Sequence, residues 1–356
     1  MKKTLIATTI ALTSAFAVPA QADVNVSGWL DVTLNMGDRA VDVGGTDAKY
    51  MDNNDDGTFT DVYRYFGLGF TGSEDIGNGM KTGFSAYYSK YPTAGNSMSN
   101  FGDDGGPQIW LSGGFGKISV GKLDTAARTV FNSTASWTGT SYTGNRIEWS
   151  PRSDVGSDGG LRNKQEGINF APKMAGPVAI AIEMGPTVAG VVSTPTAAAE
   201  KEGTFGHMGL RASYANGPIT AGLGYTTTAN SGDENDTTNM VLAGKFKTKM
   251  FAVGLAYGTN DNGADANNEL TTTFLQGDYY MGANTLRLAL GTNSRDMEAA
   301  DAAYDKSVTA LQFARKLGKP VSAYFTYYTE VETSKTGGVE TETTDTGMNV
   351  GLAYSF

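Results

Sequence analysis

Cysteine is absent from this chain of 356 residues, and histidine occurs once. Without cysteine the fold can hold no disulfide, whichever compartment it occupies. After the first 22 residues there is also no apolar run of about 18 residues, which excludes a transmembrane helix. Basic residues are in deficit, with 27 Lys and Arg against 37 Asp and Glu, so general binding to nucleic acid is disfavoured.

Glycine and alternating apolar residues are what the chain has in quantity. It contains 47 glycines, its hydrophobic fraction is 40%, and its mean hydropathy is −0.27. The glycine content is unusual for a helical enzyme. The mild polarity does not argue against a membrane protein, because the strands of a membrane barrel alternate apolar and polar residues.

The N-terminal segment has the three parts of a secretory signal peptide. Lys2 and Lys3 give a positive start, residues 5–18 are mostly apolar, and Ala20-Gln21-Ala22 forms a small-x-small cleavage site. We expect residues 1–22 to be removed and residues 23–356 to form one exported domain. Loss of the two lysines changes the formal charge from −10 to −12, because residues 1–22 contain no acidic residue.

The C-terminal segment alternates with the period of a strand. Its larger apolar and aromatic residues share one face, while small or polar residues share the other; the first set is Met348, Val350, Leu352, Tyr354 and Phe356. A strand that ends on an aromatic residue is typical of a membrane barrel, in which aromatic rings lie at the lipid–water boundary.

Similar alternating segments recur through the chain and predict about sixteen strands. Most have close to the ~9–11 residues that a tilted strand needs to cross a bilayer. The expected strands are 24–36, 61–72, 79–90, 107–114, 116–122, 163–171, 176–185, 204–215, 218–228, 237–247, 249–259, 270–281, 284–293, 305–316, 320–330 and 345–356.

The connections between these segments are of two kinds. Some are tight turns, and others are long and polar, as at 37–60, 92–106, 260–269 and 330–345. Outer-membrane barrels show this asymmetry, with short periplasmic turns and long outer loops. We therefore predict an all-β fold, a closed antiparallel transmembrane β-barrel of about sixteen strands. Closure leaves no unpaired backbone edge in lipid.

The alternation also assigns side chains to lipid or to the lumen. Leu286, Leu288 and Leu290 are expected to face lipid, with Arg287 facing inward. The inward residues are expected to be small or polar. A barrel of about sixteen strands is wide enough to enclose water, which suits such a lining.

Three segments resemble the general bacterial porins, and most closely the alphaproteobacterial type. Residues 72–81, Gly-Ser-Glu-Asp-Ile-Gly-Asn-Gly-Met-Lys, resemble the first periplasmic turn of that family. Residues 109–122 resemble its fourth and fifth strands, and residues 351–356 its last strand. The resemblance implies a homotrimer of diffusion channels in the outer membrane, in contact with lipid and lipopolysaccharide. Their function would be passive diffusion of small hydrophilic solutes and ions.

The resemblance also implies a constriction loop after the fifth strand, here about 123–161. In that family the loop folds into the lumen, and its acids face a basic cluster on the wall, which creates a transverse field. The expected constriction residues are Lys122, Arg162, Arg211, Asp124, Glu148 and Asp154. Lys245 and Arg287 are further inward-facing bases. A family arginine on the second strand is replaced by Gly67 here.

Two alternatives to the general channel stay open. One is a substrate-selective channel, for a sugar or an anion, with a saturable binding site. The other is a barrel that acts as a receptor, an adhesin or an enzyme. His207 is expected to face inward, but nothing around it resembles a nucleophile motif. We therefore expect no enzymatic activity.

One outer segment resembles the start of a calcium-binding loop. Asp52, Asn54 and Asp56 place oxygen atoms at alternate positions, and Gly57 permits the turn. The twelfth position is Tyr63 instead of a bidentate glutamate, so the pattern is incomplete. We expect no required cofactor, with Ca²⁺ an optional ligand of the outer loops.

Overall fold

The computed structural model describes residues 23–43, 46–48, 58–90, 107–133, 164–186, 205–229, 236–261, 269–297 and 302–356. The expected signal peptide, residues 1–22, lies outside these ranges. So do the six expected site residues Asp52, Asn54, Asp56, Glu148, Asp154 and Arg162.

The described chain is almost entirely β-structure. The strands are β1 (Asp23–Val43), β2 (Thr46–Ala48), β3 (Thr58–Gly77), β4 (Met80–Lys90), β5 (Gln108–Gly113), β6 (Gly116–Asp124), β7 (Lys164–Pro172), β8 (Val178–Pro186), β9 (Phe205–Asn216), β10 (Ile219–Thr228), β11 (Thr237–Lys247), β12 (Phe251–Asp261), β13 (Glu269–Met281), β14 (Asn284–Met297), β15 (Ala302–Lys316), β16 (Val321–Thr336) and β17 (Val339–Ser355). One helix, α2 (Ala126–Asn132), follows β6. No helix among the described residues is long and apolar enough to cross a membrane.

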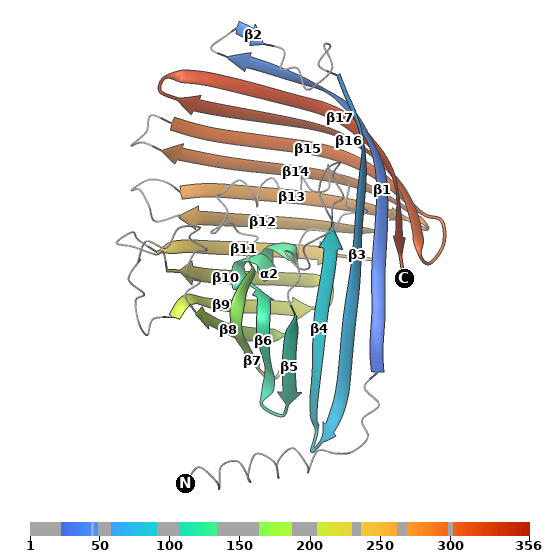
Figure 1. The fold of residues 1–356 in the computed structure, drawn as a ribbon, viewed down its shortest axis with the longest axis vertical. Helices are drawn as coiled ribbons and strands as arrows, with labels where there is room; N and C mark the ends of the chain where they lie inside the picture. The colour runs from blue at the N-terminus through green and yellow to red at the C-terminus, as the bar shows by residue number, and fades with distance from the viewer. Residues whose placement is uncertain are drawn as a thin grey trace, which may run out of the picture.

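The strands form one closed antiparallel sheet. Each long strand pairs with its neighbours in the chain, and β1 pairs with β17 from Trp29–Ser355 to Val43–Thr341. Figure 1 shows β1 beside both β3 and β17, with α2 against the middle strands. Because β2 is a three-residue extension paired with the end of β1, sixteen long strands make the wall. The prediction of a barrel of about sixteen strands is confirmed.

The two faces of the wall differ as the alternation predicts. Leu286, Leu288 and Leu290 are exposed on the outer face, while Arg287 between them is buried on the inner face. The same alternation runs through β12, whose burial changes at every residue over most of its length. Phe356, 60% exposed, continues the outer row of β17. Its backbone exchanges two hydrogen bonds with Gly28, at 2.9 and 3.0 Å, which extends the ladder beyond β17.

The predicted long loop at 330–345 is wrong. Strand β16 continues to Thr336 and β17 begins at Val339. The turn between them is Gly337-Gly338, with φ of 58° and 81°, a conformation that favours glycine. The segment is rich in threonine and glutamate on both faces, so it lacks the apolar alternation of the lipid-facing part. Its β-branched residues nevertheless favour strand.

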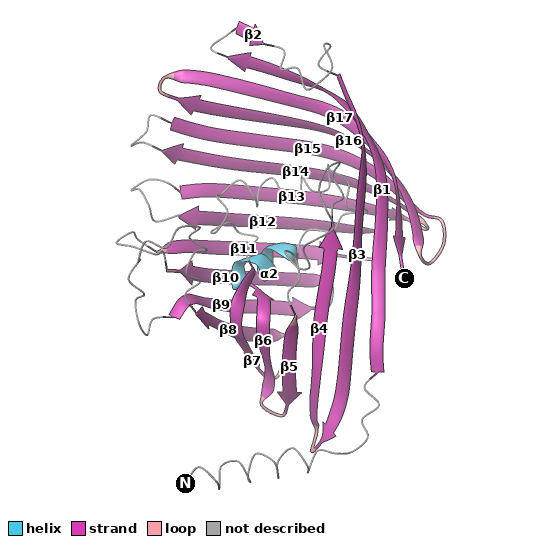
Figure 2. Cartoon of the chain, in the orientation of Figure 1, coloured by secondary structure: helices cyan, strands magenta, loops and turns pink. Residues whose placement is uncertain are grey.

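The expectation of a small or polar inner wall is also only partly right. A buried apolar cluster lies on the inner face and includes residues of the helix α2, which Figure 2 shows in cyan. Its wall residues include Val241, Phe274 and Val308, and its helix residues are Ala127, Val130 and Phe131. The aromatic rings of Phe131 and Phe274 have centroids 5.9 Å apart. Part of the lumen wall is therefore apolar because a helix packs there.

Two tyrosines bind the closing strands together on the inner face. Tyr324 on β16 lies directly opposite Gly351 on β17, and a Cβ at Gly351 would overlap its ring. The tyrosine thus passes over β17 to reach β1, where its hydroxyl donates to Asp31 Oδ1 at 2.7 Å and also contacts Thr33 Oγ1. Tyr328 does the same over Gly347 and reaches Asn35.

We expect Tyr324→Phe to lower the free energy of unfolding by about 1–3 kcal/mol, since it removes a buried hydrogen bond to a carboxylate. Urea titration of the refolded barrel in detergent measures the change. Tyr327→Phe on the lipid-facing side of the same strand is the matched control, because Tyr327 is 46% exposed. Equal stability of the two variants would contradict the role of the Tyr324 hydroxyl.

Candidate functional site

The helix α2 begins immediately inside the barrel wall, two residues after the end of β6. Thr125 is its N-cap, with an extended backbone and a side-chain Oγ1 that accepts from Arg128 N at 3.3 Å. At the other end, Ser133 Oγ donates to Val130 O at 2.6 Å. Short helices gain little stability from propensity alone, so this one depends on the wall against which it packs.

Two glycines on β10 make room for the helix. A Cβ at Gly222 would lie 3.2 Å from the methyl groups of Val130. A Cβ at Gly224 would lie 2.5 Å from the backbone oxygen of Ala126 and 2.9 Å from Cα of Ala127. The helix therefore lies directly on the backbone of β10. The lack of side chains at Gly222 and Gly224 determines where α2 packs on this strand.

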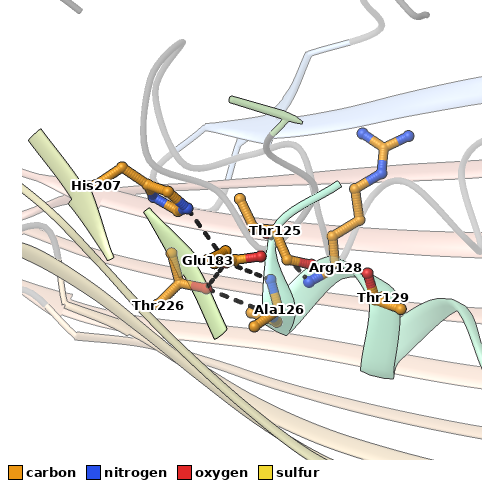
Figure 3. A network of polar contacts seen from close by, with 8 residues as sticks. Thr125, Ala126, Arg128, Thr129, Glu183, His207 and Thr226 are labelled. Carbon is orange, nitrogen blue, oxygen red and sulfur yellow. Dashed lines mark hydrogen bonds and ion pairs between the residues drawn. The ribbon is translucent and has the colours of Figure 1, made fainter. Parts of the chain in front are cut away.

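The N-terminus of α2 is hydrogen-bonded to two side chains of the wall. Ala126 N donates to Glu183 Oε1 on β8 at 2.6 Å, and Ala127 N donates to Thr226 Oγ1 on β10 at 3.4 Å. Thr226 Oγ1 in turn donates to Glu183 Oε1 at 3.3 Å. Figure 3 shows Glu183 between the start of the helix and His207, whose Nε2 lies 3.2 Å from the same oxygen.

A cavity of about 250 Å³ lies beside α2 and brings together three of the expected site residues. Lys122 and Asp124 come from the end of β6, and Arg211 comes from β9. The rest of the lining is mostly hydroxyl and amide groups from four neighbouring strands and the helix, namely Ser85, Tyr87, Gln108, Ser119, Leu123, Thr129 and Asn169. The cavity is thus polar and carries charges of both signs.

The charges around this cavity are partly paired. Asp124 Oδ1 lies 2.9 Å from Arg128 Nε, one helical turn along the chain. The acidic charges that act on Arg211 are those of Glu183 and Asp124. Of the described residues that line the cavity, two are cationic (Lys122, Arg211) and one is anionic (Asp124). The local excess is therefore one positive charge, in a chain that is acidic overall.

The other two expected inward bases lie farther along the wall. Arg287 is buried, and its Nε lies 2.7 Å from Asp278 Oδ1 while its Nη1 donates to Gln312 at 3.0 Å. Lys245 is acted on by Asp278 and, with opposite sign, by Arg287. These residues form a paired network of their own, and they do not line the cavity.

The place of the missing family arginine is filled by aromatic side chains. A Cβ at Gly67 would lie 2.5 Å from Tyr87 Oη and 2.7 Å from Trp29 Nε1. These two atoms are themselves 2.6 Å apart and hydrogen-bonded. An arginine at position 67 would have no room, so this part of the wall is neutral for a steric reason.

Sequence reasoning missed the wall residues that hold the helix. Glu183 is an acid at an inward position of a largely apolar strand, and this is a signal that the sequence carries. Thr226, Gly222 and Gly224 carry no comparable signal, because their role depends on a helix from a distant segment. His207 faces inward as expected, but its partner is Glu183. Within the described ranges no group of three or more His, Cys, Asp or Glu residues could hold a metal ion.

Comparison with known proteins gives consistent matches. A sequence model of Gram-negative porins matches residues 7–336. Two variants of the major outer membrane protein P.IB of Neisseria gonorrhoeae are 31% identical over 150 residues. That match covers 42% of this chain and 39% of each relative, so it spans about two fifths of the neisserial proteins.

Solved structures of the same shape extend over nearly the whole chain. The anion-selective porin from Comamonas acidovorans has a TM-score of 0.68 at 18% identity and covers 94% of this chain and 100% of that chain. A loop-deletion variant of OmpT from Vibrio cholerae has a TM-score of 0.61 at 13% identity, with coverages of 94% and 99%. A triple mutant of the Rhodopseudomonas blastica porin reaches 0.56 at 18% identity, with 94% and 100%. At these identities the likeness shows the fold.

We expect Gly224→Ala to displace α2 from the wall, because the added methyl group would overlap the backbone of the helix. Trypsin should then cleave after Arg128 faster than in the unsubstituted barrel. Gly277→Ala is the control, since a Cβ there meets nothing within 4 Å. Identical cleavage rates in both variants would show that the helix does not depend on this close contact.

Proposed function

The chain belongs to the Gram-negative porin family and is a barrel of the outer membrane, and we propose that it is a water-filled channel for passive diffusion of small hydrophilic solutes and ions. The observation that carries this proposal is the polar, charged cavity beside α2 on the inner wall. A barrel of sixteen strands leaves an aqueous lumen, and charged side chains lining it would be solvated by channel water. We assign no chemical reaction to it.

The narrowest part of the path is, in this proposal, the level of α2. The helix occupies lumen space next to β8–β11, and Lys122, Asp124 and Arg211 gather beside it. The remaining members of the constriction would be Arg162, Glu148 and Asp154, from residues 134–163 of the same connection. Opposed charges at a constriction orient polar solutes and select among ions.

The proposal extends to the assembly and its surroundings. We infer a homotrimer, as the resemblance to porins implies, with the exposed apolar outer face in contact with lipid and lipopolysaccharide. No cofactor is required for diffusion. Ca²⁺ held by Asp52, Asn54 and Asp56 would be an accessory ligand that bridges acidic outer loops.

Planar-bilayer recording of the purified, refolded protein tests the channel directly. We expect an ohmic conductance that increases in steps grouped in threes. The reversal potential in a salt gradient then measures the ion selectivity of the channel. A folded barrel that passes no current would contradict the proposal, because a sealed lumen cannot support diffusion.

Reversal of two cavity charges should change ion selectivity. We expect Lys122→Glu combined with Arg211→Glu to shift the reversal potential toward cations, because the local field changes sign. Lys319→Glu, in the turn between β15 and β16, is the control and should leave the reversal potential close to that of the parent. Equal potentials in parent and double variant would remove these two residues from the ion path.

A second candidate function is a selective channel with a saturable site. Its support is the size and chemistry of the cavity, which could hold a small polyhydroxylated anion between Arg211 and the amides of Gln108 and Asn169. The Comamonas protein is described as anion-selective. In the present chain that property is a proposal based on the local excess of one positive charge.

The selective channel predicts saturable block. We expect a sugar acid to reduce single-channel current along a hyperbolic curve, and Arg211→Gln to weaken that block about tenfold or more through loss of a charge-assisted hydrogen bond. The neutral parent sugar is the matched solute control. A strictly linear dependence of solute flux on concentration would favour the general channel instead.

A further inference from the structure

We propose that Glu183 is the positioning residue that fixes α2 to the barrel wall and thereby sets the width of the passage. This inference rests on the proposed channel function for its effect on conductance, but the attachment itself can be measured independently. Glu183 lies on β8, whereas the helix follows β6, so the contact joins segments that are 57 positions apart.

Three donors converge on one oxygen of Glu183. They are Ala126 N at 2.6 Å, Thr226 Oγ1 at 3.3 Å and His207 Nε2 at 3.2 Å. Since a carboxylate oxygen only accepts, Nε2 of His207 carries a proton in this arrangement. The residue is almost completely buried, at 4% exposure. A buried carboxylate that accepts from a backbone N–H forms one of the stronger hydrogen bonds available in proteins.

The position of the Glu183 side chain is determined by its neighbours across the sheet. Gly209 lies directly opposite on β9, and a Cβ there would overlap the Glu183 carboxylate. The side chain therefore passes over β9 to reach Thr226 on β10 and the start of the helix. Asn169 lies opposite on the other side, on β7. The missing side chain at Gly209 thus leaves the space in which the Glu183 carboxylate crosses β9.

Charged and polar groups from the neighbouring strands surround Glu183. From β9, His207 Nε2 lies 3.2 Å from the carboxylate and the charge of Arg211 interacts with it, while β10 contributes the neutral Thr226. Asp124 and Arg128 are paired with each other at 2.9 Å. The cation that interacts with the Glu183 carboxylate is therefore Arg211.

The polar contacts hold only the first turn of α2, whereas the apolar contacts extend along the helix from Ala127 to Phe131. Val130 and Phe131, in its second half, pack on the inner wall. Only the first turn is hydrogen-bonded to Glu183 and Thr226. Because the helix has seven residues, release of its first turn leaves less than one full turn to maintain the packing. The Glu183 contact thus lies at the start of the connection between β6 and β7, where this connection enters the lumen.

The attachment is tested by thiol labelling, which the absence of native cysteine makes possible. Val130→Cys places a thiol on the buried face of α2, where a membrane-impermeant maleimide reaches it only when the helix leaves the wall. Adding Glu183→Ala should raise the labelling rate about tenfold to a hundredfold, the factor expected for loss of a hydrogen bond to a charged group. Adding Glu183→Gln should leave it close to that of Val130→Cys alone, because the amide keeps an accepting oxygen.

Two controls separate positioning from general loosening of the barrel. Glu330→Ala removes another buried inner-wall carboxylate, one paired with Lys306 on β15, and should not change the labelling of the thiol at position 130. Thr129→Cys, beside the cavity, should be labelled at the same rate with and without Glu183→Ala. Heat-modifiable migration in SDS gels confirms that each variant is a folded barrel.

Conductance then links the attachment to the passage. We expect Glu183→Ala to raise conductance and current noise, while Glu183→Gln keeps both near the parent values and shifts only the reversal potential. Unchanged labelling with Glu183→Ala would overturn the proposal even if the parent conducts. Equal labelling and noise in the Ala and Gln variants would also overturn it, since charge alone would then explain the effect. If the unsubstituted protein does not conduct, the proposed channel function is refuted. The labelling result would still test the attachment of α2 independently.

Discussion

The antiparallel pairing of β1 with β17 closes the sheet, so that none of the long strands presents an unpaired edge to lipid. The outer face can then be apolar throughout the membrane, and the inner face can carry charge. Tyr324 and Tyr328 add side-chain hydrogen bonds across this junction, from β16 to β1. The location of α2 depends on the same closure, because a helix can be enclosed on an inner wall only when that wall encircles it.

Inner-wall glycines recur where a large side chain has to cross a strand. Tyr324 passes over Gly351, Glu183 passes over Gly209, and Trp29 lies over Gly67 on its way to Tyr87. In each case the glycine lies directly opposite the large residue in the register. The absence of a Cβ lets a side chain lie flat on the wall and bond to the second strand along. Such contacts tie together strands that share no backbone hydrogen bonds.

Most of the wall could be predicted from the sequence, because lipid on one face imposes a strict alternation over each strand. Where that alternation stops, prediction failed: Thr333, Ser334 and their neighbours continue β16 beyond the apolar band and look like a loop. The site was harder still. Lys122 and Arg211 could be placed inward from the predicted strands, and Asp124 from the resemblance, which puts it in the constriction loop. Glu183 and Gly224 act through contacts with a helix from a distant segment. Strand periodicity cannot predict where that helix packs.

The junction of β1 and β17 also bears on how such a chain reaches its final state. Leu30 on β1 pairs with Tyr354 on β17, 324 positions later. Contacts of such sequence separation form slowly, and until they form the apolar strands remain open to association with other chains. One edge of β1 stays without its final partner until β17 pairs with it. We therefore expect that nearly the whole polypeptide must be protected from association with other chains until the barrel closes.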